Sequence, residues 1–464
     1  MIDESWEFMK ERITLFTIIA ALTIFLYVFQ YHVNTLVGYA ILLAFMGVYC
    51  LYSTLAMKHN KRKLKKNPLV INEDFKPFVS IMIPAHNEES VISFTVDNIM
   101  NISYPNFEII VIDDRSTDNT PNVIKDLELK YPNKVKTLIR DKDAFPGKSA
   151  VLNDALKIAS GEAILVFDAD ATVEPDFLSK LVPCIEPQDV GAVQARKVIR
   201  NGSHNLLTKC QYNEYVLDTH LQVGRDAIKG AVELRGNGEL IKRAALEDID
   251  GWNNYTITDD LDMSTRLHIK GWDVRYCPSA EVYEEGIIYL TPLFRQRRRW
   301  LEGTIRRYLE YSSEAMKSAK MSLRAKFDMI IYITQFIMPG WMILEIVLRA
   351  FKACTGKAGD IHNEVIMSLA FALLTAVGYF TGIRYSLRRY DNQKRWDALV
   401  QASYTAVYML VIWYPMVMFI CGKILFCKKD LNWGKTAHGL VLEEENTQVT
   451  AIDVINNEKD LQEV

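Results

Sequence analysis

Two long apolar segments dominate the first part of the chain. Residues 13–30 and 33–57 contain no Asp, Glu, Lys or Arg. At a rise of about 1.5 Å per residue, each segment is long enough to cross a hydrocarbon core of about 30 Å. The pattern therefore predicts a transmembrane hairpin over residues 1–57.

The last third of the chain is apolar again. Three further stretches, each long enough to span a bilayer, lie at about 329–348, 365–383 and 398–421. They predict C-terminal transmembrane segments over residues 327–427, followed by a polar tail over residues 428–464 that is disordered or weakly helical. Glu345 and Pro339-Gly340 interrupt the first stretch, so it is expected to be kinked, re-entrant or in contact with a polar path. The number of spans and the side of the membrane that holds the tail stay open.

Between these apolar parts, short β-rich runs alternate with amphipathic helical stretches. The runs at 78–84, 107–112 and 163–167 are predicted strands, and a helix that ends near Met100 is expected to be capped by residues 87–90. This alternation predicts an α/β fold in which helices cover a parallel sheet. No Gly-x-Gly-x-x-Gly follows the first two strands, which disfavours a dinucleotide-binding fold.

The distribution of charge orients the middle of the chain. Residues 58–77 form a basic linker, with positive charges at Lys58, Lys61, Arg62, Lys63, Lys65 and Lys66. By the positive-inside rule, the domain that follows is cytoplasmic, in a multi-pass protein of the plasma membrane. A nucleic-acid interface is disfavoured, because the run abuts an apolar span and no interleaved aromatic residues follow it. The seven cysteines contain no CxxC pair, which argues against a zinc site and against a disulfide framework.

A second basic segment lies after the middle of the chain. Residues 304–326 combine apolar positions with many lysines and arginines. This mixture predicts an amphipathic helix that lies in the membrane interface.

Acidic residues follow two of the predicted strands. Asp113 and Asp114 come after one strand, and Asp168 and Asp170 after another. In such sheets ligands bind beyond the carboxyl ends of the strands, and Mg²⁺ or Mn²⁺ commonly bridges carboxylates to substrate phosphates. Asp168 and Asp170 are therefore candidate metal ligands, with a solvated Asp-x-Asp turn as the alternative. Lys148 is a candidate nucleotide contact or a solvated lysine at a helix start, and the first glycine of a P-loop is missing before it.

Three downstream motifs complete the candidate chemistry. Gly236–Gly238 either lets the backbone approach a ligand closely or forms an ordinary turn. Thr258–Asp260 lies at the start of a predicted amphipathic helix, where the helix dipole alone also accounts for acidic residues. Gln296–Trp300 combines guanidinium groups with an indole, and a tryptophan near a membrane is commonly only an interfacial anchor.

Together these motifs resemble those of glycosyltransferase family 2, in particular its membrane-bound, polymer-forming branch of cellulose, hyaluronan and poly-N-acetylglucosamine synthases. The matching segments are VSIMIPAHNEE, VIDDRSTDNT, VFDADA, ITDDLDMSTRL and QRRRW, in the family's order. The segments ELRGNGELIKRAAL and ITDDLDMSTRLHIKGW also resemble bacterial β-monoglucosyldiacylglycerol synthases, which glucosylate a lipid. The family often has Thr-Glu-Asp where this chain has Thr-Asp-Asp at 258–260, a shortening by one methylene that leaves the third position intact.

The resemblance implies a cytoplasmic GT-A catalytic domain over residues 78–303, inserted between transmembrane helices. It implies that Asp114, with Asp113 beside it, binds the uridine of a UDP-sugar and that Asp260 is the general base. Asp168 and Asp170 would engage the diphosphate and Mg²⁺ or Mn²⁺. The other candidate contacts to the donor, the acceptor end or the leaving diphosphate are Lys148, Gly236, Asn237, Gly238, Gln296, Arg299 and Trp300.

The implied chemistry is an inverting transfer, in which an acceptor hydroxyl attacks the anomeric carbon from the face opposite the diphosphate. The preferred interpretation is a membrane-integrated hexosyltransferase that adds glucose or N-acetylglucosamine to a growing β-linked polysaccharide, coupled to export, with room for an accessory membrane subunit. The alternative is a glycolipid synthase that transfers one glucose to diacylglycerol. A non-catalytic membrane protein that binds nucleotide sugars is disfavoured, because binding alone needs neither Asp260 nor Gln296–Trp300.

Overall fold

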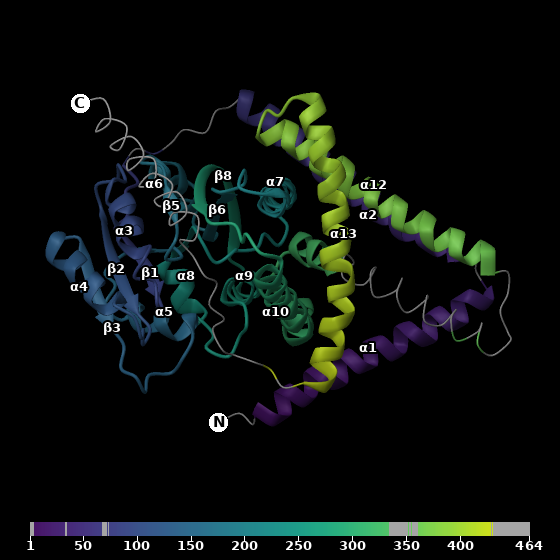
Figure 1. The fold of residues 1–464 in the computed structure, drawn as a ribbon, viewed down its shortest axis with the longest axis horizontal. Helices are drawn as coiled ribbons and strands as arrows, with labels where there is room; N and C mark the ends of the chain where they lie inside the picture. Colours follow the sequence, from purple (N-terminus) through teal and green to yellow (C-terminus); the bar gives the residue numbers. More distant parts are fainter. Residues whose placement is uncertain are drawn as a thin grey trace, which may run out of the picture.

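The computed structural model describes residues 4–32, 35–66, 72, 74–333, 351, 354, 361–427 and 429. Within these residues, a layered α/β part lies beside a group of long helices (Figure 1). Most of the first C-terminal apolar stretch, with Glu345 and Pro339-Gly340, lies outside the described residues, and so does the expected polar tail apart from residue 429.

A mixed eight-stranded sheet forms the α/β part, in the spatial order β3-β2-β1-β4-β7-β6-β8-β5. The strands of its first half are parallel to one another: β1 (Val79–Ala85), β2 (Phe107–Asp113), β3 (Val135–Ile139) and β4 (Ala163–Val166). The second half consists of β5 (Thr172–Val173), β6 (Val190–Ile199), β7 (Glu239–Lys242) and β8 (Asp273–Glu284). The predicted parallel α/β arrangement is confirmed for β1 to β4. The sheet becomes mixed at β7, which lies antiparallel to both β4 and β6.

Side chains alternate between the two faces of the sheet, and helices cover both faces. Leu165 and Leu240 point to the face covered by α3 (Ile92–Met100), α4 (Thr120–Lys130) and α6 (Phe177–Leu181). Their neighbours Ile164 and Ile241 point to the face covered by α5 (Lys148–Leu156), α8 (Arg243–Asp248) and α9 (Asp259–Lys270). A short 3-10 turn, Val182–Ile185, follows α6. The candidate residues Lys148 and Asp260 therefore lie in the first turns of two helices on the same face of the sheet.

The loop after β1 differs from the prediction of a capped helix. The helix α3 starts only at Ile92 and has no side-chain cap, so the predicted capping role of residues 87–90 is wrong. Asn87 instead has a positive φ of 56°, and its side-chain oxygen accepts hydrogen bonds from the N–H groups of Thr117 and Asp118 at 2.7 and 3.3 Å. Its amide serves to join the loop after β1 to the loop after β2.

Long helices form the rest of the described molecule: α1 (Glu4–His32), α2 (Thr35–Lys66), α7 (Leu206–Ala227), α10 (Leu290–Lys317), α12 (Ile361–Tyr390) and α13 (Arg395–Phe426). The helices α7 and α10 lie between the sheet and the outer helices (Figure 1). Leu217 of α7, Leu301 of α10, Ile383 of α12 and Met409 of α13 belong to one buried apolar cluster. This cluster fixes the outer helices against the α/β part.

The outer helices contain four of the predicted membrane segments. The helices α1 and α2 contain the segments predicted at 13–30 and 33–57, and α12 and α13 contain those at 365–383 and 398–421. Within the described residues, length and composition would allow one helix, α13, to cross a membrane. A membrane crossing by the other helices stays a prediction.

The sequence predicted a domain boundary at residue 304, which lies within α10 in the structure. The helix runs without a break from Leu290 to Lys317, so the boundary falls inside one helix. Arg306 and Arg307 are only 2% and 4% exposed and pair with Glu302 and Glu233. The basic residues of this stretch are thus partly used for internal ion pairs.

A buried carboxylate joins α2 to the α/β part. Asp328, in the helical stretch 323–333, is 0% exposed and accepts hydrogen bonds from Arg225 Nε at 2.8 Å and from the N–H of Ala231 at 2.9 Å. The hydroxyl of Tyr49 on α2 also donates to it. Arg225 lies on α7, so a single side chain connects three helices.

Replacing Asp328 by Ala should strongly destabilise the fold. The guanidinium of Arg225 would lose its closest carboxylate, and breaking a buried ion pair from one side costs about 3–5 kcal/mol. The apparent thermal unfolding midpoint of the purified protein measures this effect. The control is Asp176→Ala, which removes a 56% exposed carboxylate from an ion pair with Lys180 on the surface. Equal shifts for the two variants would contradict the prediction.

Candidate active site

The end of β2 holds the first acidic pair in a fixed geometry. Asp114 is 1% exposed, and its carboxylate accepts hydrogen bonds from Arg140 Nη1 at 2.6 Å and Arg115 Nε at 2.9 Å. Asp113 Oδ2 accepts from the N–H of Ser116 at 3.2 Å, whereas its buried Oδ1 has no hydrogen-bond partner in the described part of the chain. Asp113 therefore keeps an acceptor that a nucleotide N–H could use.

Lys148 meets the acidic pair that follows β4. Its Nζ donates to Asp168 Oδ1 at 2.6 Å and to the carbonyl of Gly236 at 2.9 Å. Burial lowers the pKa of Lys148, but the charges of Asp168 and Asp259 outweigh this effect, so the pKa is raised overall. The ammonium is therefore charged at the point where the anionic side chains gather.

The carboxylates after β4 could bind a metal ion that also coordinates the substrate. Asp168 and Asp170 supply carboxylate oxygens, and Asp170 Oδ2 also accepts from the N–H of Glu285 at 3.1 Å. Among the described residues, no three His, Cys, Asp or Glu side chains are placed to enclose a metal ion. Mg²⁺ and Mn²⁺ commonly bind with one or two carboxylates and complete their coordination with substrate phosphates and water. The two aspartates fit such a substrate-bridging ion.

The glycine motif joins this acidic pair to Asp260. Asn237 is fully buried, and its Oδ1 accepts from the N–H of Asp168 at 3.2 Å. Gly236 and Gly238 have φ values of 76° and 71°, and a Cβ on Gly236 would lie 3.4 Å from Asp260 Oδ2. A side chain here would be strained and would lie against Asp260. The motif is therefore a close packing element of the site rather than an ordinary exposed turn.

Asp260 lies in the first turn of α9. Its Oδ1 accepts from the N–H of Leu261 at 2.8 Å, and the hydroxyl of Ser264 donates to its backbone carbonyl at 2.7 Å. Burial and then the neighbouring charge of Asp259 raise the pKa of Asp260 to about 6. The carboxyl can thus both accept and release a proton near neutral pH, which a general base requires.

The residues of the motif Gln296–Trp300 lie in different environments on α10. Arg297 is fully buried in an ion pair with Glu214 at 2.9 Å, and its guanidinium lies 4.1 Å from the ring centre of Trp300. Trp300 lines a cavity together with Asp260, whereas Gln296 and Arg299 are half-buried on α10 and do not line it. The cavity therefore favours Trp300, among these residues, as a neighbour of the acceptor.

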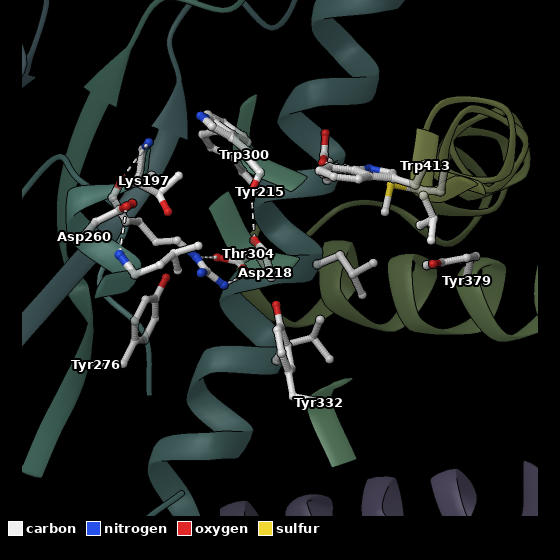
Figure 2. A pocket seen from close by; sticks show the side chains of 18 of the residues that line it. Lys197, Tyr215, Asp218, Asp260, Tyr276, Trp300, Thr304, Tyr332, Tyr379 and Trp413 are labelled. Carbon is white, nitrogen blue, oxygen red and sulfur yellow. Dashed lines mark hydrogen bonds and ion pairs between the residues drawn. The ribbon is translucent and has the colours of Figure 1, made fainter. Parts of the chain in front are cut away.

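This cavity has a volume of about 220 Å³ and extends from Asp260 to the outer helices (Figure 2). Lys197, Asp218 and Arg235 line its polar end. Its other end is lined by Tyr379 of α12 and by one face of α13: Met409, Trp413, Tyr414 and Val417. The candidate base is thus connected to the helix that is apolar enough to cross a membrane.

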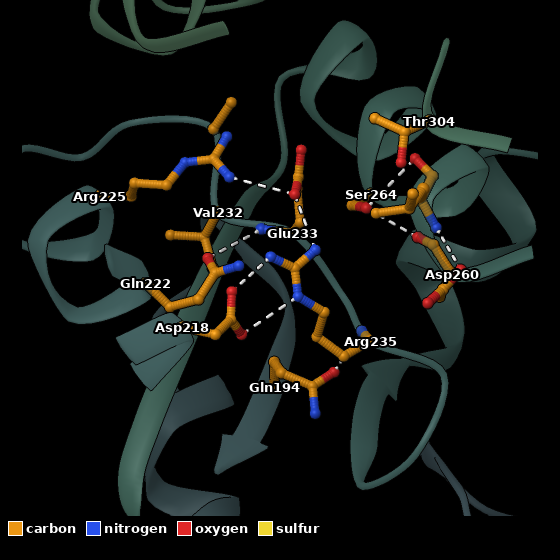
Figure 3. Close-up of polar contacts among 12 residues, drawn as sticks. Gln194, Asp218, Gln222, Arg225, Val232, Glu233, Arg235, Asp260, Ser264 and Thr304 are labelled. Carbon is orange, nitrogen blue, oxygen red and sulfur yellow. Dashed lines mark hydrogen bonds and ion pairs between the residues drawn. The ribbon is translucent and has the colours of Figure 1, made fainter. Parts of the chain in front are cut away.

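A buried ion network supports the polar end of the cavity (Figure 3). Glu233 is 3% exposed and pairs with Arg225 at 3.2 Å, Arg235 at 2.8 Å and Arg307 at 2.8 Å. Arg235 also pairs with Asp218 at 2.8 Å, and both of these side chains line the cavity. The network therefore holds Arg235 in one position beside Asp260.

Sequence reasoning missed Lys197, Asp218 and Arg235, which line the cavity, and Glu239, whose carboxyl group acts on Lys148. Lys197 and Asp218 lie in stretches without a motif, so no pattern pointed to them. Arg235 and Glu239 flank Gly236–Gly238, and charged residues next to a glycine pair that approaches a ligand were a usable signal.

Comparison with known proteins identifies the family. The model of the glycosyltransferase-like family 2 domain matches residues 77–303. The chain is 39% identical to the β-monoglucosyldiacylglycerol synthase of Nostoc sp. over 78% of its own length and 76% of that protein. It is 25% identical to a poly-β-1,6-N-acetyl-D-glucosamine synthase of Staphylococcus epidermidis over 81% of its own length and 89% of that protein. A mannosyltransferase from Pyrobaculum calidifontis, solved with GDP-Man and Mn²⁺, has a TM-score of 0.54 at 22% identity, covering 81% of this chain and 99% of that chain.

The fold and the family match define a sugar-transferring enzyme with a GT-A domain. The chain belongs to glycosyltransferase family 2, as the motifs had predicted. The mannosyltransferase shares the fold, and the identity to the synthases supports the transfer of a sugar.

With Asp260 as the candidate base, the transfer rate should fall as the pH drops through about 6, because a base must be deprotonated to accept a proton and the pKa of Asp260 is raised to about 6. Replacing Asp259 by Asn removes a negative charge that raises this pKa, so the acidic limb should move to lower pH. The pH profile of kcat/KM for UDP release measures both effects. Asp248→Asn, which removes an exposed charge on α8, serves as the control and should leave the limb in place. An acidic limb that stays fixed in Asp259→Asn would contradict the prediction.

Proposed function

We propose that this enzyme transfers a single hexose, of the glucose class, from a UDP-sugar to the hydroxyl of a diacylglycerol-like lipid, with inversion at the anomeric carbon. The observation that carries this proposal is the cavity that leads from Asp260 to the apolar face of α13. The identity to β-monoglucosyldiacylglycerol synthase supports the same acceptor. The alternative interpretation of the sequence is therefore better supported than polymer synthesis with export.

The shape of the cavity matches an acceptor with one polar end. Met409, Trp413 and Val417 are spaced by four residues, so they present one continuous face of α13 to the cavity. Lys197 lies at the opposite end, next to Asp260 (Figure 2), and Arg235 also lines the cavity. An acyl chain can lie along the apolar face while the glycerol hydroxyl reaches the base, and burying the chain is favourable by about 25 cal/mol per Å².

The donor would lie at the carboxyl ends of β2 and β4. Asp113 would accept a hydrogen bond from the base of the nucleotide through its unpartnered Oδ1. Lys148 would exchange its contact with Asp168 for a contact with the diphosphate, which carries more negative charge than a carboxylate. Asp168 and Asp170 would hold Mg²⁺ or Mn²⁺, which supplies positive charge for the leaving diphosphate. Arg299 and Gln296 are proposed to contact the same leaving group from α10.

Asp260 would remove the proton from the acceptor hydroxyl as that oxygen attacks the sugar. Its side chain is fixed by the N–H of Leu261 at 2.8 Å, and its partly raised pKa favours proton uptake near neutral pH. Trp300 would pack against the acceptor beside it. The reaction breaks the bond from the anomeric carbon to UDP, forms the new glycosidic bond and leaves the proton on Asp260, so no covalent enzyme intermediate is needed.

A growing polysaccharide is the second candidate acceptor. The cavity contains several aromatic rings, which can stack on sugars: Tyr215, Tyr276, Trp300, Tyr332, Tyr379, Trp413 and Tyr414. The identity to the staphylococcal synthase favours the same acceptor, although at 25%. In either case we propose a catalytic domain on the cytoplasmic face and an attachment to the membrane through α1, α2, α12 and α13.

Membranes with this enzyme, incubated with UDP-glucose, diacylglycerol and Mn²⁺, should form a chloroform-soluble lipid that carries one hexose. Mass spectrometry of the product and assay of released UDP provide the measurement. Asp260→Asn should still bind the UDP-sugar but should lose the transfer by about a hundredfold or more, as is typical for a general base. A long water-soluble polymer as the product would support the second candidate, and full activity of Asp260→Asn would contradict the base assignment.

A matched pair of variants on α13 tests the path of the lipid. Val417 is 4% exposed and lines the cavity, whereas Val411 is 59% exposed on the same helix. Val417→Phe should raise the KM for diacylglycerol about tenfold, because the larger ring fills space that the acyl chain would use. Val411→Phe should leave the KM unchanged. Equal KM values for the two variants would contradict this path, provided that their unfolding midpoints agree.

A further inference from the structure

Glu239 is the first residue of β7 and follows Gly236–Gly238 directly. It lies opposite Val166 of β4 and opposite Gln194 of β6 in the sheet. Since side chains alternate along a strand, Glu239 points to the same face as Ile241, which is the face covered by α5 and α9. Its carboxyl group therefore lies beneath the first turns of these two helices, where Lys148 and Asp259 begin them.

The carboxyl group of Glu239 is buried without a donor. Its side chain belongs to a residue that is 0% exposed, and neither of its oxygens has a hydrogen-bond partner in the described part of the molecule. An ionised carboxylate in such a place loses its hydration and gains no hydrogen bond in return. The geometry thus disfavours the charged form.

The charges near Glu239 also disfavour its ionised form. The carboxylates of Asp259, Asp260 and Asp168 repel a negative charge at this position, and Lys148 attracts it. Burial first, and then the charge of Asp259, raise the pKa of Glu239 well above its usual value. Three negative neighbours outweigh the single ammonium, which Asp168 already engages at 2.6 Å.

A buried carboxylate oxygen at the start of α9 also lacks a hydrogen-bond donor. Asp259 Oδ2 is buried and has no hydrogen-bond partner in the described residues. The hydroxyl of Thr258 also lacks one there, but it lies toward α10, where a Cβ on Gly303 would approach it to 2.4 Å. One proton on Glu239 would therefore give a hydrogen bond to Asp259 Oδ2 and engage one of the two unpartnered glutamate oxygens.

We infer that Glu239 is a neutral carboxylic acid that donates its proton in a hydrogen bond to Asp259 Oδ2, directly or through one water molecule. This inference rests on the proposed role of Asp260 as the base. Glu239 is then a positioning residue: it holds Asp259, whose backbone continues into Asp260 at the start of α9. Because Glu239 is neutral, it also adds no negative charge near the position where the diphosphate of the donor would lie.

The test compares Glu239→Gln with Glu239→Leu. The amide of Gln can donate the same hydrogen bond without carrying a charge, so Glu239→Gln should keep kcat within about threefold of the unchanged protein. Leu cannot donate, so Asp259 and the start of α9 would lose the hydrogen bond that positions them, and Glu239→Leu should lower kcat by about tenfold to a hundredfold. The KM for the UDP-sugar should change little in both variants, and UDP release provides the measurement.

Infrared difference spectroscopy gives a second measurement that does not need activity. The spectrum of the unchanged protein minus that of Glu239→Gln should contain the carbonyl band of a protonated carboxylic acid at neutral pH. A carboxylate band in its place would overturn the inference. Equal losses of kcat in Glu239→Gln and Glu239→Leu, or no loss in Glu239→Leu, would also overturn it. If Asp260→Asn kept full activity, the base assignment would fail, while the infrared result would still report on Glu239 itself.

Discussion

The candidate site depends on a balance of charge around the buried ammonium of Lys148. Two like charges about 4 Å apart repel each other by about 4 kcal/mol at an effective dielectric constant of about 20. Gathering Asp168, Asp259 and Asp260 at one edge of the sheet is therefore unfavourable unless a positive charge lies among them. Lys148 supplies that charge through its contact of 2.6 Å with Asp168. The first turn of α9 adds the positive end of a helix dipole beside Asp259 and Asp260.

The same ammonium ties the glycine motif into the site. Lys148 donates to the carbonyl of Gly236 at 2.9 Å, and Asn237 accepts from the backbone of Asp168. The loop before β7 is thus held by the start of α5 and by the end of β4. A donor that attracts Lys148 away from Asp168 would change the contacts of this loop as well, so donor binding and the position of Asp260 are expected to be linked.

The positions of the candidate donor residues in the fold could be predicted from the sequence better than the side chains that line the cavity. Asp113, Asp168 and Lys148 follow strands or start helices, and the local pattern of a strand and its end is visible in the chain itself. The contact between Lys148 and Asp168 lies at the carboxyl end of β4, where such sheets bind their ligands. Asp218, Arg235 and Lys197 could not be predicted in this way. They come together only through the packing of α7 and β6 against β7, which no local pattern records.

The long helices show the same limit. Apolar stretches predicted that α12 and α13 are helices, but not which face of α13 would lie against the catalytic domain. That face is chosen by Met409, Trp413 and Val417, which continue the apolar cluster of α7 and α10. The prediction of a capped helix at residues 87–90 failed for a related reason, since the amide of Asn87 is used by a loop that lies thirty residues further along the chain.

The polar groups around the cavity bear on the choice between a sugar and a lipid acceptor. Glu214 lines the cavity near α13, yet its oxygens already accept from Arg297 at 2.9 Å, Tyr408 at 3.1 Å and Trp413 at 3.2 Å. A sugar ring has several hydroxyl groups, and each of them needs a partner when it is buried. An acyl chain needs none. Because the charged group at the far end is satisfied by the protein itself, that end offers more to an acyl chain than to a second sugar, while Asp260 lies at the opposite end of the cavity.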